Sequence, residues 1–446
     1  MEDSLSPLDG RYLIKTKQLR YYFSEKSFFK YRLLIEIKYF LKLIDILPEL
    51  NDLKESKDII TNDLMTYYNN FDSNQYKTIK NIETTTKHDV KALEYHIQNI
   101  FVKMNIPKYV PFIHFGLTSQ DINTSANILA LKDAVKSVLI PELYKIINVL
   151  NIYHKEMMNV PMLSFTHGQP AVPTTMGKEL NVFNYRLKEQ IHYIENFIYT
   201  TKFGGAVGNF NAHVLAYPNI DWNKFADQFI EDDLQLKREC VTSQISNYDN
   251  LCNILNFIKT INNIINDLNI DCWLYISKGY LKQRVNNNEI GSSTMPHKVN
   301  PINFENSEGN ICIANSIIEG ITRKLPISRL QRDLSDSTIL RNIGTILGYC
   351  LLSYTSTYEG LNKITLDRDV IRNELNSNPI ILSEGIQTVM RKHNINDAYE
   401  QMKDLTRNNS DITSEKMNNY ISTLNNDLQS ELSSLSVENY LGYSNV

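Results

Sequence analysis

Hydrophobic side chains recur along most of this chain at the spacing of a helix. One stripe consists of Leu33, Ile37, Phe40, Leu41 and Ile44. Such positions share one face because an α-helix has about 3.6 residues per turn. A longer stripe runs from Leu251 to Leu268, which corresponds to roughly five helical turns. Strand-like alternation of apolar and polar residues is nearly absent, so the pattern predicts an all-α fold.

The helical pattern is longest in the middle of the chain. The segments expected to form long helices lie near residues 121–158, 175–202, 245–283, 303–324 and 335–362. Several approach or exceed about 25 residues, which is typical of a helix bundle. Pro141 is expected to kink the helix that it interrupts. We therefore expect a central long-helix bundle over residues 111–365, an N-terminal helical domain over residues 1–110 and a C-terminal helical domain over residues 366–446.

Composition excludes several classes of protein. The chain has 446 residues, 42% of them hydrophobic and 22% charged, with a net charge of −4. This balance is ordinary for a soluble globular protein. The chain has no excess of basic residues, so its charge does not suggest nucleic-acid binding. No apolar run reaches the ~18 residues of a membrane span, and the polar start Met1–Ser4 is unlike a secretory signal. The five cysteines form no CxxC pair, so zinc and redox motifs are not expected; buried free thiols fit a cytoplasmic protein.

Polar residues gather in the loops expected over 106–117, 160–174, 203–220 and 283–303. The last loop ends in GSSTMPHKVNP, residues 291–301. Removing a proton beside a carboxylate creates an aci-carboxylate with two negative charges, which Lys298 and the amide of Asn300 could stabilise. A helix expected to begin near Ile302 would add its free N–H groups. A serine beside these groups could act as a base, although a polar turn before a helix is the alternative.

A second polar segment, THGQP at residues 166–170, contains His167. Histidine is the natural general acid near neutral pH, but a lone histidine in such a turn is more often structural. The pair His88–Asp89 precedes a helical pattern, so spacing alone favours a helix cap over a substrate contact. Thr118 with Asp121 has the spacing of an N-cap.

Arginines accompany the polar segment 333–338, since Arg329, Arg332 and Arg341 flank it. The guanidinium group suits phosphate because it is always charged and binds with two parallel hydrogen bonds. Arg11, beside the aromatic Tyr12, offers a further candidate. By spacing alone, each of these arginines is more often a surface residue. The glycine-rich segment 203–213 lacks the P-loop and dinucleotide patterns, and close helix packing is its simplest interpretation.

Together these segments resemble the motifs of the fumarase/aspartase superfamily of fumarate-releasing lyases. The loop at residues 291–301 is similar to the pattern GSSxMPxKxNP. LDGRY, GxTSxD, THGQP, GAVGNxNAH and QRDLSDSTxLRN, together with the histidine at position 297, resemble the bacterial-type branch of the adenylosuccinate lyase family. Fumarases typically carry glycine, and argininosuccinate lyases glutamine, where His297 stands. The resemblance runs from about residue 5 to residue 400 and implies a three-domain, all-α fold.

The resemblance also implies roles for individual residues. Ser292 would be the catalytic base and His167 the acid that protonates the departing nitrogen. Glu305 would orient and charge that histidine, although it could instead complement the helix dipole. Lys298 and Asn300 would stabilise the aci-carboxylate.

The resemblance assigns the remaining motif residues to the nucleotide substrate. Arg11, Tyr12, Arg332, Ser337 and Arg341 would hold the phosphate, and His88 with Asp89 would contact phosphate and ribose. Thr118 and Ser119 would bind one substrate carboxylate. The other substrate contacts expected on this basis are Lys87, Gln169, Gln244 and Asn306.

The implied reaction is release of fumarate from adenylosuccinate, and from the succinyl-carboxamide ribotide of purine synthesis, with no metal or organic cofactor. The family is a homotetramer whose sites take residues from three chains. No nucleic acid and no membrane partner is expected. Two alternatives stay open at this point: another lyase of the superfamily, such as argininosuccinate lyase, and a non-catalytic helical scaffold.

Overall fold

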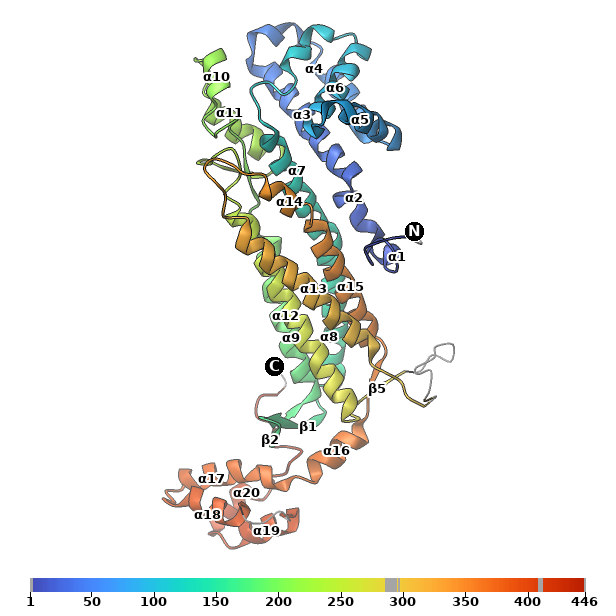
Figure 1. The fold of residues 1–446 in the computed structure, drawn as a ribbon. Coiled ribbons are helices and arrows are strands. Elements are labelled where there is room, and N and C mark those ends of the chain that lie inside the picture. Colours follow the sequence, from blue (N-terminus) through green and yellow to red (C-terminus); the bar gives the residue numbers. More distant parts are fainter. Residues whose placement is uncertain (1–2, 285–294, 296, 408–411, 445–446) are drawn as a thin grey trace. The chain divides into compact units, whose positions relative to one another are not determined.

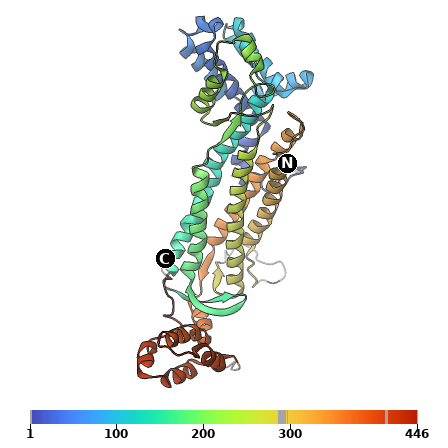
Figure 2. The same cartoon turned by 90° about the vertical axis from the view of Figure 1, so that its left-hand side faces the viewer.

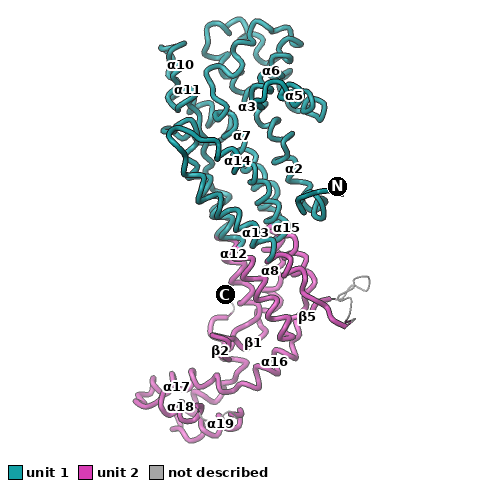
Figure 3. The backbone as a smooth tube through the Cα atoms, in the orientation of Figure 1, with its two compact units in different colours: residues 1–142, 190–262, 309–353 teal, residues 143–189, 263–308, 354–446 magenta. Residues whose placement is uncertain are grey.

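The computed structural model describes residues 3–284, 295, 297–407 and 412–444. Helices dominate this part of the chain (Figure 1), which confirms the all-α prediction. The chain divides into two compact units (Figure 3). Unit 1 comprises residues 1–142, 190–262 and 309–353, and unit 2 comprises residues 143–189, 263–308 and 354–446.

Unit 1 begins with a helical segment that packs on the start of α7 (Ser119–Ala134). Its helices are α1 (Leu13–Thr16), α2 (Arg20–Phe23), α3 (Glu25–Ile46), α4 (Lys57–Asn69), α5 (Ser73–Thr86) and α6 (Asp89–Lys103). The first apolar stripe predicted from the sequence lies on α3, where Leu33, Ile37 and Ile44 are almost fully buried. Helix α3 runs beside α7 (Figure 1, Figure 2) and contacts it through another face, where Tyr31 donates to Asp133 and Arg32 to Asn123. Phe40 of the stripe packs instead on Phe101 of α6.

Long helices are present in each region where the sequence predicted them, but the one expected over residues 335–362 is divided into α14 (Ser335–Leu340) and α15 (Ile343–Leu361). Helix α7 passes through a π-helical turn (Val135–Leu139) into α8 (Ile140–Met157). The turn ends two residues before Pro141, which cannot donate a backbone hydrogen bond to the helical ladder. The other long helices are α9 (Met176–Glu195), α12 (Asp249–Ser277), α13 (Ile302–Lys324) and α15 (Ile343–Leu361). None of the helices in the described residues is long and apolar enough to cross a bilayer.

Shorter elements complete unit 1. Strand β3 (Thr200–Lys202) pairs in parallel with β4 (Lys237–Glu239). The short helices are α10 (Asn211–Ala216), α11 (Trp222–Gln228) with a π-helical turn (Phe229–Asp233), and α14 (Ser335–Leu340).

Unit 2 contains a β-hairpin where the sequence predicted a loop. Strands β1 (Pro161–Thr166) and β2 (Gln169–Thr175) pair antiparallel, with a register shift between Leu163 and Ser164. The prediction of a loop over residues 160–174 was therefore wrong. Its prolines suggested a loop, but proline is compatible with strands at bulges and edges, and this two-stranded sheet has both.

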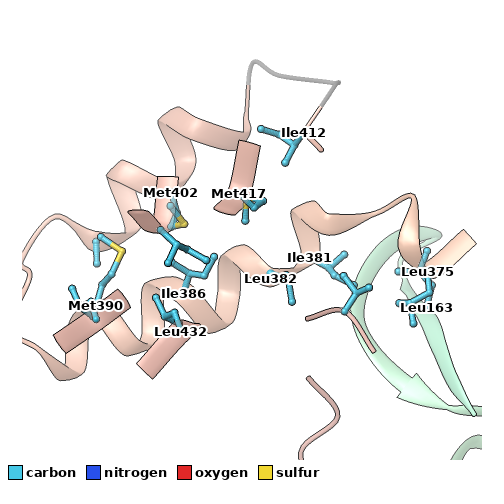
Figure 4. Close-up of a cluster of buried hydrophobic side chains, with 14 residues drawn as sticks. Leu163, Leu375, Ile381, Leu382, Ile386, Met390, Met402, Ile412, Met417 and Leu432 are labelled. Carbon is cyan, nitrogen blue, oxygen red and sulfur yellow. The ribbon is translucent and has the colours of Figure 1, made fainter. Parts of the chain in front are cut away.

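The rest of unit 2 includes a helical C-terminal segment. Strand β5 (Leu281–Gln283) pairs antiparallel with β6 (Ile364–Leu366). The helices that follow are α16 (Arg368–Asn376), α17 (Ser383–Lys392), α18 (Ala398–Thr406), α19 (Ser414–Ser422) and α20 (Asn426–Leu432). Their apolar faces form a cluster that includes Ile386, Met390 and Leu432 (Figure 4), and Leu163 of β1 belongs to it. This cluster attaches the hairpin to the C-terminal helices.

A buried ring of hydrogen bonds joins three long helices within unit 2. Asn269 of α12 donates to Ser307 of α13 at 2.9 Å, and Thr357 of α15 donates to Asn269 at 2.9 Å. The hydroxyls of Ser307 and Thr357 are 2.9 Å apart. Because all three side chains are fully buried and mutually satisfied, the ring specifies how these helices align.

Close packing of α2 on α15 in unit 1 gives a testable consequence. A Cβ at Gly344 would lie 2.5 Å from Cβ of Phe23, whereas one at Gly320 would meet no atom within 4 Å. We expect Gly344→Ala to lower the free energy of unfolding by about 1–3 kcal/mol through overpacking. Gly320→Ala, the matched helical control, should raise it by about 0.5–1 kcal/mol. Urea unfolding followed by circular dichroism measures both, and equal stability of the two variants would contradict the packing described.

Candidate active site

The motif around Thr118 forms the start of α7, as the sequence predicted. Thr118 is the N-cap, and its side chain accepts from the backbone of Asp121 while its own N–H donates to Asp121 Oδ2 at 2.8 Å. Such a reciprocal capping box fixes the first turn of a helix. It leaves Thr118 and Ser119 partly exposed at the N-terminus of α7, where helix N–H groups favour an anion.

Three further candidate residues meet in unit 1. Arg332 donates to Gln244 Oε1 at 3.1 Å and to the hydroxyl of Ser337 at 3.4 Å. The Gln120 side chain, which follows Ser119, donates to Ser337 at 3.3 Å. Residues from separate motifs are thus joined in one polar cluster at the start of α7.

The cluster depends on residues to which sequence reasoning gave no role. Asp336 accepts from Gln120 at 3.1 Å and from the hydroxyl of Tyr248 at 2.8 Å, and all three side chains are buried. Burial raises the pKa of Tyr248, and the Asp336 carboxylate raises it further, so the tyrosine remains a donor. Gln120 stands in the polar run Thr118–Asp121, so no local pattern marked it as buried and no sequence signal revealed this contact.

The pair His88–Asp89 does form a helix cap, but the capping residue is His88. Its Nδ1 accepts from the backbone N–H of Lys91 at 3.2 Å, at the start of α6. Asp89 forms an ion pair with Arg32 at 2.6 Å, and Arg32 also donates to Asn123 of α7 at 2.8 Å. Burial would raise the pKa of Asp89, but attraction to Arg32 outweighs it and lowers the pKa. Arg32, which sequence reasoning missed, therefore ties this pair to α7.

The remaining candidates of unit 1 lie at exposed element ends. Lys87 ends α5 in the left-handed region with φ of 51°. Arg11 is exposed and Tyr12 half-buried just before α1, while Arg341 is exposed at the end of α14. In the part of the chain that the structure describes, no hydrogen bond joins Arg11 or Arg341 to the Arg332 cluster.

In unit 2, His167 lies at the tip of the hairpin. Thr166 pairs with Gln169, so His167 and Gly168 form a two-residue turn, and both have positive φ, 54° and 71°. Turns of this kind require left-handed backbone at both central positions. The turn leaves the side chains of His167 and Gln169 exposed.

The other candidates of unit 2 surround the start of α13, which begins at Ile302 as expected. Lys298 is exposed and Asn300 half-buried before this helix, and the Gln283 side chain donates to the carbonyl of Val299 at 3.0 Å. In its first turns, Glu305 accepts from Trp273 at 3.1 Å, and Asn306 accepts from Ser356 at 2.8 Å. Ser292 lies outside the described residues.

The described residues contain neither a contact between His167 and Glu305 nor a metal-binding group. Among the described residues, no hydrogen bond joins the His167 ring to Glu305. No group of histidine, cysteine, aspartate or glutamate in that part of the chain could hold a metal ion.

Comparison with known proteins identifies the family. Residues 10–314 match a family described as lyase, and residues 328–441 match one described as adenylosuccinate lyase C-terminal. Adenylosuccinate lyase of Dictyostelium discoideum is 44% identical, over 98% of this chain and 96% of the relative. The enzyme of the same name from Legionella pneumophila is 43% identical, over 99% and 96%. The chain belongs to the adenylosuccinate lyase family.

Solved structures agree on the fold of this adenylosuccinate lyase family member. A fumarate lyase from Mesorhizobium sp. BNC1 superposes with a TM-score of 0.75 at 16% identity, covering 96% of each chain. The 3-carboxy-cis,cis-muconate lactonizing enzyme from Pseudomonas putida gives 0.72 at 18% identity, covering 96% of this chain and 94% of the other. At such identities the likeness shows the fold alone, and it confirms the helical fold of the superfamily.

A largely buried histidine lies in the segment that leads to Thr118. His114 has left-handed backbone, with φ of 56°, and its Nδ1 lies 2.6 Å from Oε1 of the buried Glu36. Burial alone would lower the pKa of His114, but attraction to Glu36 and their hydrogen bond raise it above 6.5. Because the folded protein binds this proton more tightly, the pair stabilises the fold at low pH, and the contribution is lost as pH rises through the raised pKa.

This linkage predicts a pH-dependent difference between the wild type and Glu36→Gln. The amide preserves an acceptor but removes the charge that retains the proton on His114. The loss of unfolding free energy caused by the substitution should be largest near pH 6 and shrink toward pH 9, as measured by urea unfolding at each pH. A loss that is independent of pH, or that grows toward alkaline pH, would contradict this account of the ion pair.

Proposed function

We propose that this protein cleaves adenylosuccinate to AMP and fumarate by β-elimination, and that it performs the same cleavage on succinyl-aminoimidazole-carboxamide ribotide in purine synthesis. The observation that carries the proposal is the Arg332–Gln244–Ser337 cluster at the start of α7. An arginine held by neighbouring side chains beside a helix N-terminus is suited to a phosphorylated, carboxylate-bearing substrate. This arginine cluster occurs in a chain that is 44% identical to an adenylosuccinate lyase over 98% of its own length.

In the proposed mechanism, Ser292 removes the proton beside the succinyl carboxylate. The resulting aci-carboxylate needs positive charge and donors fixed in advance. Lys298 and Asn300 precede α13, so they and the free N–H groups of that helix supply both. His167 protonates the leaving nitrogen, and Glu305 stabilises the charged histidine. No metal or organic cofactor is required for these steps.

Substrate binding is proposed to use the other candidates named from the sequence. Arg332, Ser337 and Gln244 form one polar surface, to which Arg11, Tyr12 and Arg341 would add further contacts with the phosphate. His88 and Asp89 would contact phosphate and ribose, with Lys87 beside them.

The remaining contacts involve the succinyl group. Thr118 and Ser119 would bind one of its carboxylates at the start of α7. Gln169 lies beside His167, and Asn306 lies beside Glu305, so both would contact the reacting part of the substrate.

We further propose a homotetramer in which each site takes residues from three chains. In unit 2, Val182 and Tyr185 on α9 and Ile270, Trp273 and Leu274 on α12 are exposed, with values from 38% to 65%. Arg186 joins these helices through an ion pair with Asp267 at 2.6 Å. Exposed apolar side chains gathered in this way are typical of an interface between subunits. Contact with other copies would also give the exposed His167 its partners.

The substrate is proposed to be a small nucleotide, with no nucleic acid or membrane partner. Cys252, Cys272 and Cys350 are buried free thiols, whereas Cys240 and Cys312 are exposed. Unpaired thiols are typical of a reducing compartment, and we expect the protein to act in the cytoplasm.

The direct test is fumarate release from purified protein supplied with adenylosuccinate, with argininosuccinate and malate as controls. We expect release from adenylosuccinate only. Release from argininosuccinate alone would retain the chemistry but discard the nucleotide site. No turnover of any of the three by folded protein would favour a non-catalytic scaffold.

A variant pair tests the phosphate assignment. Arg332→Met should lower kcat/KM for adenylosuccinate by about 10–100-fold, the scale of a lost hydrogen bond to a charged group. Arg329→Met is the matched control, because Arg329 is 81% exposed and pairs with Asp333; its kcat/KM should equal that of the wild type. Equal effects of the two substitutions would contradict a specific role of Arg332.

A further inference from the structure

A buried ion pair in unit 1 has no role in the chemistry assigned so far. Lys202, the last residue of β3, places its Nζ 2.6 Å from Oδ1 of Asp121, and both side chains are 0% exposed. Burial lowers the pKa of Lys202, and attraction to Asp121 opposes this effect. Burying two charges costs several kcal/mol per ion. Because an apolar pair of similar volume is often equally stable, stability alone does not account for this arrangement.

The Asp121 carboxylate joins two loops. Besides Lys202, it accepts from the N–H groups of Thr118 at 2.8 Å and Gly204 at 2.8 Å. It also accepts from the N–H of Gly205, at 3.1 Å to Oδ2. Lys202 donates in addition to the carbonyl of Gly205 at 2.6 Å. One carboxylate and one ammonium therefore fix both the capping turn of α7 and the glycine-rich loop.

The glycine-rich loop lies against the backbone that leads to Thr118. Gly205 has φ of 75°, and a Cβ there would lie 3.3 Å from the carbonyl of Gly116. A Cβ at Gly116 would in turn lie 2.7 Å from the ring of His213. These close approaches leave residues 116–119 little freedom to shift once the ion pair fixes the glycine-rich loop.

We propose that Lys202 is a positioning residue for the Thr118–Ser119 turn, and that through this turn it sets the binding of a substrate carboxylate. The inference rests on the proposed function, which assigns this turn to the succinyl group. The ammonium does not touch substrate. It fixes the orientation of Asp121 and of the Gly204–Gly205 amides, which in turn determine where the N-terminus of α7 and its hydroxyls point.

The experiment compares two variants that disturb this arrangement differently. Lys202→Met removes the charge and both hydrogen bonds but preserves most of the volume. Gly205→Ala leaves the ion pair in place and presses on the carbonyl of Gly116, and it keeps the proposal testable if the first variant does not fold. Lys57→Met is the control for loss of an ion-paired lysine, since Lys57 of α4 pairs with Asp45 of α3 at 2.5 Å. Gly279→Ala is the control for left-handed glycine, with φ of 76°.

The measurements are the thermal midpoint, kcat and KM for adenylosuccinate, and separate inhibition constants for the products fumarate and AMP. We expect Lys202→Met and Gly205→Ala to lower kcat/KM by about 10–100-fold, as a misplaced binding group does. The inhibition constant of fumarate should rise by a similar factor, whereas that of AMP, which lacks a succinyl carboxylate, should stay unchanged. Both control variants should match the wild type in all kinetic constants.

A purely structural role for Lys202 gives a different result. Parallel rises in both inhibition constants, or an unchanged kcat/KM in folded variants, would overturn the proposed positioning role while leaving the proposed function intact. A wild type that releases no fumarate from adenylosuccinate would overturn the proposed function and this inference together.

Discussion

The carboxylate of Asp121 is buried, and a buried anion must be surrounded by donors. Lys202, Thr118 and Gly204 supply them, which brings together a helix start, a strand end and a glycine-rich loop that are distant in sequence. The polar cluster of Gln120, Asp336 and Arg332 follows from this arrangement, because Gln120 extends from the turn that Asp121 caps. The substrate surface proposed for unit 1 is therefore organised around one charge that does not itself reach the surface.

Unit 2 is governed by a different constraint. The two-residue turn forces His167 into left-handed backbone and leaves its ring exposed, while the start of α13 presents Lys298, Asn300 and Glu305. The hairpin that carries His167 packs on the C-terminal apolar cluster. Helix α13 is held by the Asn269–Ser307–Thr357 ring. In the account proposed here, His167 meets Glu305 in a site shared between copies of the chain.

Sequence alone predicted the helical fold, the long helices and the capping turn at Thr118, because periodicity and capping are local properties. It also found Arg332, Gln244 and Ser337 as candidates, although only the fold places them in contact. It missed the β1–β2 hairpin, whose prolines resemble those of a loop, and it predicted a cap at the pair His88–Asp89 without showing that His88 is the capping residue. Arg32, Asp336 and Lys202 had no local signal, since their importance arises from burial and from partners far away in the chain.

The central claim is that this lyase builds each site from several copies of the chain, and subunit mixing tests it most directly. Ser292→Ala and His167→Ala proteins should each lose about 10²–10⁴-fold in rate, the usual scale for acid–base groups. When the two inactive proteins are mixed and exchange subunits, the account predicts that fumarate release from adenylosuccinate partly recovers, because some hybrid sites contain neither substitution. No recovery, with subunit exchange confirmed by mass-tagged chains, would contradict it.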